Sequence, residues 1–172
     1  QGELPVITKT EQTRDVVLDP AEGADGFLVR EADGTLTSLG HIDAVFPVLH
    51  GPNGEDGTLQ GLLEMMQVPY VGCGVLASAA CMDKYYAKQL FKAAGIDVAP
   101  GIALDVRKFA SDAANHFDSY ANEILEQVEE AKLEYPLFVK PSRAGSSFGV
   151  TKVESRDAKA LADAVFEASK HD

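Results

Sequence analysis

Residues 138–149 read Phe-Val-Lys-Pro-Ser-Arg-Ala-Gly-Ser-Ser-Phe-Gly, and this stretch decides how the chain folds. The apolar run that begins at Leu137 predicts a short buried strand. Pro141 stops the strand because proline has no backbone N–H to donate, which leaves Lys140 at the strand's end.

The loop that follows the lysine is small and carries hydroxyl groups. Gly145 and Gly149 allow backbone conformations closed to other residues, so backbone N–H groups and the hydroxyls of Ser146 and Ser147 can converge on phosphate oxygens. The alternative is a plain strand followed by a tight turn. The preceding Val-Lys-Pro at this spacing favours a phosphate-binding site.

The chain's charge argues against nucleic acids and membranes as partners. The 172 residues include 15 basic and 27 acidic side chains, a formal net charge of -12, and the lysines are scattered along the sequence. An anionic backbone or membrane surface would be repelled. No apolar run approaches the roughly 20 residues that span a bilayer. The first residues also lack the features of a signal peptide, so a soluble cytoplasmic protein is expected.

Cys73 and Cys81 are the two cysteines of the sequence. With no histidine pair nearby, they predict free, partly buried thiols in preference to a disulfide or a metal site.

The first half of the chain alternates short apolar runs with glycine-punctuated loops. The expected strands are 6–8, 16–18, 42–49 and 68–71, with an Asp33-Gly34 hairpin turn between 27–29 and 35–37. A helix is expected over 58–66, with Leu59, Leu62, Leu63 and Met66 on one face. Strand, polar loop and helix form the βα unit of a doubly wound parallel sheet.

The second half predicts helices around a strand-loop-strand hairpin. The first expected helix runs from Ser78, its N-cap, to Ala94, and Gly95 lies at its C-terminal end. A strand over 100–104, a helix over 112–132 and a hairpin of 136–140 with 149–153 are expected next. The last expected helix is capped by Ser155 and has Leu161, Ala164, Val165 and Ala168 on its inward face. A domain division near residue 79 follows from this change of pattern.

Four motifs occur in a fixed order along residues 42–153. They are His50-Gly51-x-x-Gly54-Glu55-Asp56-Gly57-x-x-Gln60-Gly61, Pro69-Tyr70-x-Gly72, Ser78-Ala79-x-x-Met82-Asp83-Lys84-x-x-x-Lys88 and Val139-Lys140-Pro141-x-x-x-Gly145-Ser146-Ser147-x-Gly149. Together they resemble D-alanine–D-alanine ligase, a family of the ATP-grasp superfamily. The resemblance implies an α/β fold, with a parallel Rossmann-like N-terminal domain over 1–79 and part of an ATP-grasp α+β domain over 80–172.

The resemblance also implies a reaction. A D-alanine carboxylate attacks the γ-phosphate of ATP, and a second D-alanine then displaces phosphate from the acylphosphate to give a dipeptide for peptidoglycan. ATP and Mg²⁺ are the implied cofactors, and a homodimer is the implied assembly. The implied roles are as follows: phosphate binding by Lys84 and Lys140, a substrate-site triad that includes Ser146, a phosphate loop of Gly145, Ser147 and Gly149, and a substrate pocket near His50.

Several of these residues have plainer interpretations. Lys84 taken alone is a surface lysine on a helix, and the Met-Asp-Lys context favours the functional role. His50 ends a strand, where it could equally cap the next helix. Glu55 and Asp56 are expected to stabilise a helix start.

The resemblance covers only part of the family's pattern. The family's first strand, its adenine pocket and its magnesium ligands are expected to lie outside these residues, so the segment alone is expected to be inactive. A D-alanine–D-lactate ligase and a non-catalytic nucleotide-binding fragment remain alternative functions.

Overall fold

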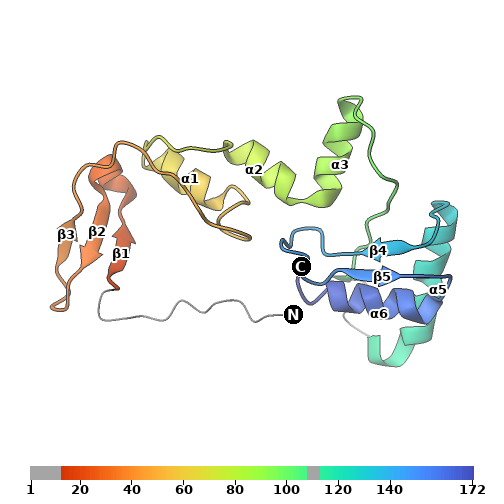
Figure 1. Ribbon diagram of the computed structural model, residues 1–172. Coiled ribbons are helices and arrows are strands. Elements are labelled where there is room, and N and C mark those ends of the chain that lie inside the picture. The colour runs from red at the N-terminus through yellow and green to blue at the C-terminus, as the bar shows by residue number, and fades with distance from the viewer. Residues whose placement is uncertain (1–12, 108–112) are drawn as a thin grey trace. The chain divides into compact units, whose positions relative to one another are not determined.

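The computed structural model describes residues 13–107 and 113–172, and the chain divides into two compact units (Figure 1). The first unit comprises Gln1–Val48 and Leu59–Gly72, and the second comprises Leu49–Thr58 and Cys73–Asp172.

The first unit contains a three-stranded antiparallel sheet. Its elements are β1 (Asp15–Leu18), the 3-10 helix η1 (Pro20–Asp25), β2 (Phe27–Arg30) and β3 (Leu36–Ser38), with the strands in the order β1-β2-β3. At the β2–β3 turn Gly34 has a φ of 87°, and the Asp33 carboxylate accepts hydrogen bonds from the backbone N–H and hydroxyl of Thr35. The strand expected at 16–18 and this hairpin are confirmed. The strand expected at 6–8 lies outside the described residues.

Helix α1 (Thr58–Met65) provides the apolar core of the first unit. Leu63 and Met66 are fully buried, together with Val68. Leu59 and Leu62 pack against them, so the predicted apolar face of this helix is confirmed.

Parallel pairing between the described strands is limited to one bridge, which joins Val45 to Tyr70. Val45 makes backbone hydrogen bonds of 2.8 and 2.9 Å to the residues on either side of Tyr70. The next ladder bonds would need N–H groups from Pro47 in one direction and from Pro69 in the other, and proline has none. The two longer strands predicted here are therefore wrong in length.

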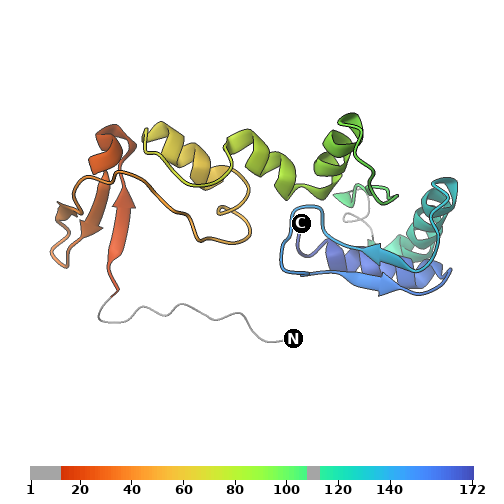
Figure 2. The ribbon, with the colours of Figure 1, turned by 45° about the horizontal axis from the view of Figure 1, so that its top comes forward.

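The second unit is built from helices and a β-hairpin. Its elements are α2 (Val75–Met82), α3 (Lys84–Ala93), α5 (Ala113–Glu130), β4 (Leu137–Val139), β5 (Thr151–Val153) and α6 (Ala158–Ala168). The strands pair antiparallel, with Leu137 opposite Val153 and Val139 opposite Thr151, as predicted for a hairpin around the glycine loop. In Figures 1 and 2, α6 lies against this hairpin and α5 lies against α6.

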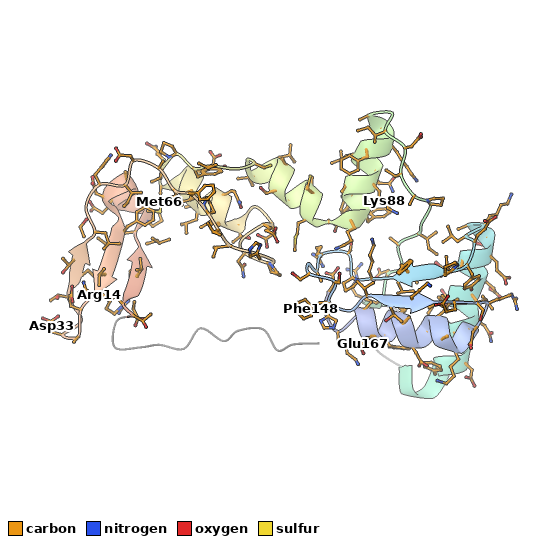
Figure 3. All side chains as sticks on the ribbon, viewed as in Figure 1. Arg14, Asp33, Met66, Lys88, Phe148 and Glu167 are labelled. Carbon is orange, nitrogen blue, oxygen red and sulfur yellow. The ribbon has the colours of Figure 1, made fainter. Side chains whose placement is uncertain are left out.

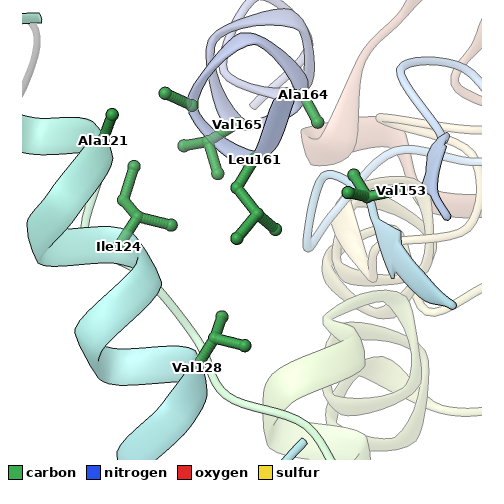
Figure 4. Packing of buried hydrophobic residues seen from close by; sticks show 8 residues of the cluster. Ala121, Ile124, Val128, Val153, Leu161, Ala164 and Val165 are labelled. Carbon is green, nitrogen blue, oxygen red and sulfur yellow. The ribbon is translucent and has the colours of Figure 1, made fainter. Parts of the chain in front are cut away.

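The core of the second unit lies between α5, α6 and β5 (Figure 4). Ile124 and Leu161 are each only 1% exposed, and Val153 projects from β5 toward the same cluster. The inward face predicted for the last helix is confirmed, because Leu161, Ala164, Val165 and Ala168 are all buried.

The single helix predicted from Ser78 to Ala94 is wrong, because the chain breaks at Asp83 into α2 and α3. Asp83 has extended backbone angles, φ -89° and ψ 109°, and its carboxylate accepts hydrogen bonds from the N–H groups of Tyr85 and Tyr86. Asp83 is therefore the N-cap of α3. Ser78 instead lies inside α2, where its hydroxyl donates to the Cys73 carbonyl.

Two further predictions need correction. The last helix is capped by Asp157, whose carboxylate accepts from the N–H of Ala160 at 3.0 Å, and not by Ser155. The strand expected over 100–104 is absent from the described structure. The ammonium group of Lys88 donates to the carbonyl of Ala99, immediately before this segment, and Leu104 at its end packs against the core of the second unit.

Candidate active site

Strand β4 presents two different faces. Leu137 and Val139 pack on the α5–α6 core, whereas Phe138 is 62% exposed. The alternation of a strand puts Lys140 on the same face as Phe138. The prediction of a buried strand is therefore wrong for Phe138, and the open face of β4 forms part of a groove.

The groove has a volume of about 420 Å³ and lies entirely within the second unit. It is lined by Cys81, Met82, Lys84, Phe138, Lys140, Pro141, Ala144, Gly145, Ser146, Ser147, Phe148 and Val150. Figure 3 shows Phe148 on the loop that joins β4 to β5, and Lys88 on α3. Lys84 and Lys140, the two lysines predicted to bind phosphate, thus line one groove together with residues of the glycine loop.

The loop itself contains a tight turn with an unusual backbone. The N–H of Phe148 donates to the carbonyl of Gly145 at 3.1 Å, and the two residues between them, Ser146 and Ser147, have φ values of 49° and 59°. Two consecutive positive φ angles are typical of a type I′ turn, where Asn and Gly are the favoured residues. Serine at both positions is strained, and such strain is often retained where a side chain is needed for function.

Gly149 closes the loop with a φ of 65°. A Cβ atom there would lie 2.6 Å from the ring of His171 and 3.0 Å from Pro141. Gly149 does not line the groove. Its contribution is to let the chain turn back into β5 where Pro141 and His171 leave no room for a side chain.

Lys84 contacts the segment that leads into the loop. Its Nζ atom donates to the carbonyl oxygens of Ser142 at 3.2 Å and Ala144 at 2.6 Å. An ammonium group has three N–H donors, so one remains for a ligand in the groove.

Electrostatics links three lysines that are far apart in the sequence. Burial, and then repulsion by Lys140, lowers the pKa of Lys84, while Asp172 and Asp83 oppose this shift. Burial and the same repulsion lower the pKa of Lys88. Like charges held together in a partly buried site favour binding of a polyanion.

His50 does not line this groove, although it belongs to the same unit. Its side chain is exposed, and the strand that His50 was expected to end is not formed at this position. In the same loop, Glu55 accepts from the N–H of Gly51, and Asp56 accepts from the N–H groups of Asn53 and Thr58. Both carboxylates therefore have structural partners.

The residues around the groove do not provide a metal site. Within 13–107 and 113–172, no group of three or more His, Cys, Asp or Glu side chains could hold a metal ion. The same residues include no helix long and apolar enough to cross a membrane.

Two family models match the chain. The model described as "D-ala D-ala ligase N-terminus" matches residues 5–73, and "D-ala D-ala ligase C-terminus" matches residues 90–172. The chain belongs to the D-alanine–D-alanine ligase family.

Curated relatives within this family are highly similar. A D-alanine–D-alanine ligase of Bifidobacterium adolescentis is 68% identical over 98% of the chain, and one of Bifidobacterium longum is 54% identical over 99%. The chain spans 44% and 48% of the lengths of these two relatives.

Solved structures of the family confirm the α/β fold with a partial ATP-grasp domain. The VanG D-Ala:D-Ser ligase of Enterococcus faecalis superposes with a TM-score of 0.69 at 42% identity, covering 92% of this chain and 40% of that one. The D-alanyl-alanine synthetase A of Vibrio cholerae gives a TM-score of 0.68 at 29% identity, covering 93% of this chain and 42% of that one. The domain division at residues 79 and 80 stays a prediction.

Sequence reasoning missed part of the groove. Phe138 lines the groove but was predicted to lie in a buried strand, and Met82 was given no role there. Cys81 also lines the groove, and the prediction that Cys73 and Cys81 are partly buried is wrong, because both thiols are free and exposed. The alternation in β4 was the available signal for Phe138. The carbonyl partners of Lys84 lie 58 and 60 residues away, and no local pattern indicates them.

Proposed function

We propose that the complete gene product containing this chain is an ATP-dependent ligase. It joins two D-alanine molecules through an acylphosphate intermediate and supplies the dipeptide for peptidoglycan, and hence for cell wall synthesis and cell shape. The observation that carries the proposal is the single groove that holds Lys84, Lys140 and the strained serine turn in a chain of the D-alanine–D-alanine ligase family.

The lysines provide positive charge for the phosphate groups of ATP. ATP, when bound, supplies the phosphoryl group that activates the first D-alanine carboxylate. Lys140 and the remaining N–H of Lys84 neutralise the charge on the phosphate oxygens, which is the main catalytic demand of phosphoryl transfer. In this proposal Lys140 is catalytic.

The glycine loop accounts for positioning and for exclusion of water. Ser146 contributes its hydroxyl to the substrate site and is the second catalytic residue, and Ser147 with Gly145 directs donors at phosphate oxygens. Gly149 allows the chain to turn from the loop back into β5. A covered groove protects an acylphosphate from hydrolysis until the amine of the second D-alanine attacks it.

Other parts of the proposal rest on the family alone. His50 contacts the amino-acid substrate, the enzyme is a cytoplasmic homodimer, and Mg²⁺ is a cofactor. The described residues do not fit a magnesium site, so no step of the reaction is assigned to the metal here.

The proposal is tested by incubating the complete gene product with ATP and D-alanine. Dipeptide and phosphate are expected in equal amounts, and no dipeptide is expected without ATP. ATP binding with neither product would support a non-catalytic nucleotide-binding protein instead. Phosphate release without dipeptide would show ATP hydrolysis and would contradict the proposed ligation.

A second candidate differs only in the second substrate. The relative from Enterococcus faecalis is described as a D-Ala:D-Ser ligase and is 42% identical to this chain. The assay is therefore repeated with D-alanine plus D-serine and D-alanine plus D-lactate. Preferred formation of a mixed product would replace the D-alanine–D-alanine assignment.

A further inference from the structure

Contacts outside the groove also hold its elements together. The hydroxyl of Ser142 donates to the carboxylate of Asp83 at 2.7 Å. These residues are 59 positions apart, one before α3 and the other between β4 and the glycine loop. Neither side chain lines the groove, so neither is placed to touch phosphate.

The same carboxylate oxygen of Asp83 has three donors. It accepts from Ser142 and also from the N–H groups of Tyr85 and Tyr86 at the start of α3. Burial alone would raise the pKa of Asp83, but these hydrogen bonds outweigh it, and the pKa is lowered. The carboxylate is therefore charged at neutral pH, and hydrogen bonds to a charged acceptor are stronger than neutral ones.

Lys84 provides a second link between the N-terminus of α3 and the segment that leads into the glycine loop. Its backbone N–H donates to the carbonyl of Ser142 at 3.0 Å, while its ammonium group holds the carbonyls of Ser142 and Ala144. The position of the Lys84 ammonium group relative to the loop thus depends on how firmly Ser142 is held against α3.

We propose that Asp83 and Ser142 are positioning residues whose hydrogen bond fixes the base of the glycine loop to the N-terminus of α3, so that Lys84 and the loop meet a nucleotide phosphate as one unit. The inference rests on the proposed function for its kinetic consequence. Its structural consequence can be measured without any activity.

The kinetic test uses Ser142→Ala in the complete gene product. This variant removes the hydroxyl donor and keeps the cap of α3. The KM for ATP is expected to rise about tenfold, the equivalent of one hydrogen bond to a charged group. The KM for D-alanine is expected to stay unchanged, and Ser142→Thr, which keeps a hydroxyl, is expected to restore the KM for ATP.

The aspartate is tested against a matched helix cap. Asp83→Ala loses both the α3 cap and the bond to Ser142, whereas Asp157→Ala loses only the cap of α6. Asp83→Ala is expected to raise the KM for ATP and Asp157→Ala is not. Adding Ser142→Ala to Asp83→Ala is expected to have no further effect, because the two residues act through one bond.

Amide hydrogen exchange provides the independent readout. In Ser142→Ala without nucleotide, exchange at the N–H groups of Lys84 and Phe148 is expected to be about tenfold faster. Unchanged exchange there would overturn the inference, as would an unchanged KM for ATP in an active enzyme. A wild-type protein without ligase activity would contradict the proposed function, while the exchange data would still decide the role of Ser142.

Discussion

At the scale of single residues, the two serines of the turn are the most informative part of the site. A non-glycine residue with positive φ costs roughly 1–2 kcal/mol. Ser146 and Ser147 both have such angles, and both line the groove. Glycine would relieve the strain at either position, so serine hydroxyls at this place indicate a chemical requirement.

We predict that Ser146→Gly raises the free energy of unfolding by about 1 kcal/mol and lowers turnover about 100-fold, because strain and hydroxyl are removed together. Denaturant unfolding and a phosphate-release assay measure the two effects. Lys132→Gly is the matched control, since Lys132 has a φ of 53° beyond the end of α5 and lies outside the groove. It should add stability without changing turnover, whereas normal turnover in Ser146→Gly would show that the hydroxyl has no role.

The lysine cluster predicts a pH dependence. The pKa of Lys84 lies below its ordinary value of 10.5, so its positive charge is lost as pH rises toward that value. The KM for ATP is therefore expected to increase on the alkaline side, beginning below pH 10.5. Asp172 raises the pKa of Lys84, so Asp172→Asn should move this increase to lower pH.

The control for this measurement is Asp163→Asn, which removes a carboxylate paired with Lys159 on α6. It should leave the pH profile unchanged. A profile that moves to higher pH in Asp172→Asn would contradict the electrostatic explanation.

At the scale of elements, the sequence predicted the strands and helices that depend on local signals. The β4–β5 hairpin and the apolar faces of α1 and α6 were confirmed, because their periodicity and their glycines act within a few residues. The break at Asp83 was missed, since the helical pattern continues on both sides and the partner that favours the break, Ser142, is distant in sequence.

Helix α3 also shows which end signals are reliable. Its C-terminal end was predicted from Gly95, and the structure places Gly95 at a φ of 75° with the N–H of Ile96 donating to the carbonyl of Phe91. This is the hydrogen bond of a Schellman motif, which glycine fits without strain.

A pair of glycine substitutions tests the energetics of these helices. Gly95→Ala should lower the free energy of unfolding by about 1 kcal/mol, because alanine disfavours positive φ and no neighbouring atom lies within 4 Å to add a clash. Gly61→Ala, within α1 and equally open, should raise it by about 1 kcal/mol through helix propensity. Thermal unfolding measures both, and equal shifts of the same sign would contradict the backbone argument.

At the scale of the whole molecule, an acidic chain contains a cationic groove. The net charge is -12, yet Lys84, Lys88 and Lys140 interact electrostatically within the second unit. The sequence showed these lysines as scattered, because only the fold brings α3 next to the end of β4. Lys140 and the serine loop, which are close together in the chain, both line the groove, and their chemical roles stay a prediction.

The sequence was less informative about His50 and about how the long apolar runs pair. His50 belongs to a different motif from the other candidate residues, and it does not line their groove. The expected parallel sheet is reduced to one bridge among the described strands, where two prolines remove the next donors.

The most direct test of the account is dipeptide formation by the Lys140→Ala variant of the complete gene product. Lys159→Ala, on the surface of α6 and outside the groove, is the matched control. Lys140→Ala is expected to lower ATP-dependent D-alanyl-D-alanine formation at least 100-fold, whereas Lys159→Ala is expected to leave it unchanged. Normal dipeptide formation by Lys140→Ala would contradict the assignment of this groove as the site of phosphoryl transfer.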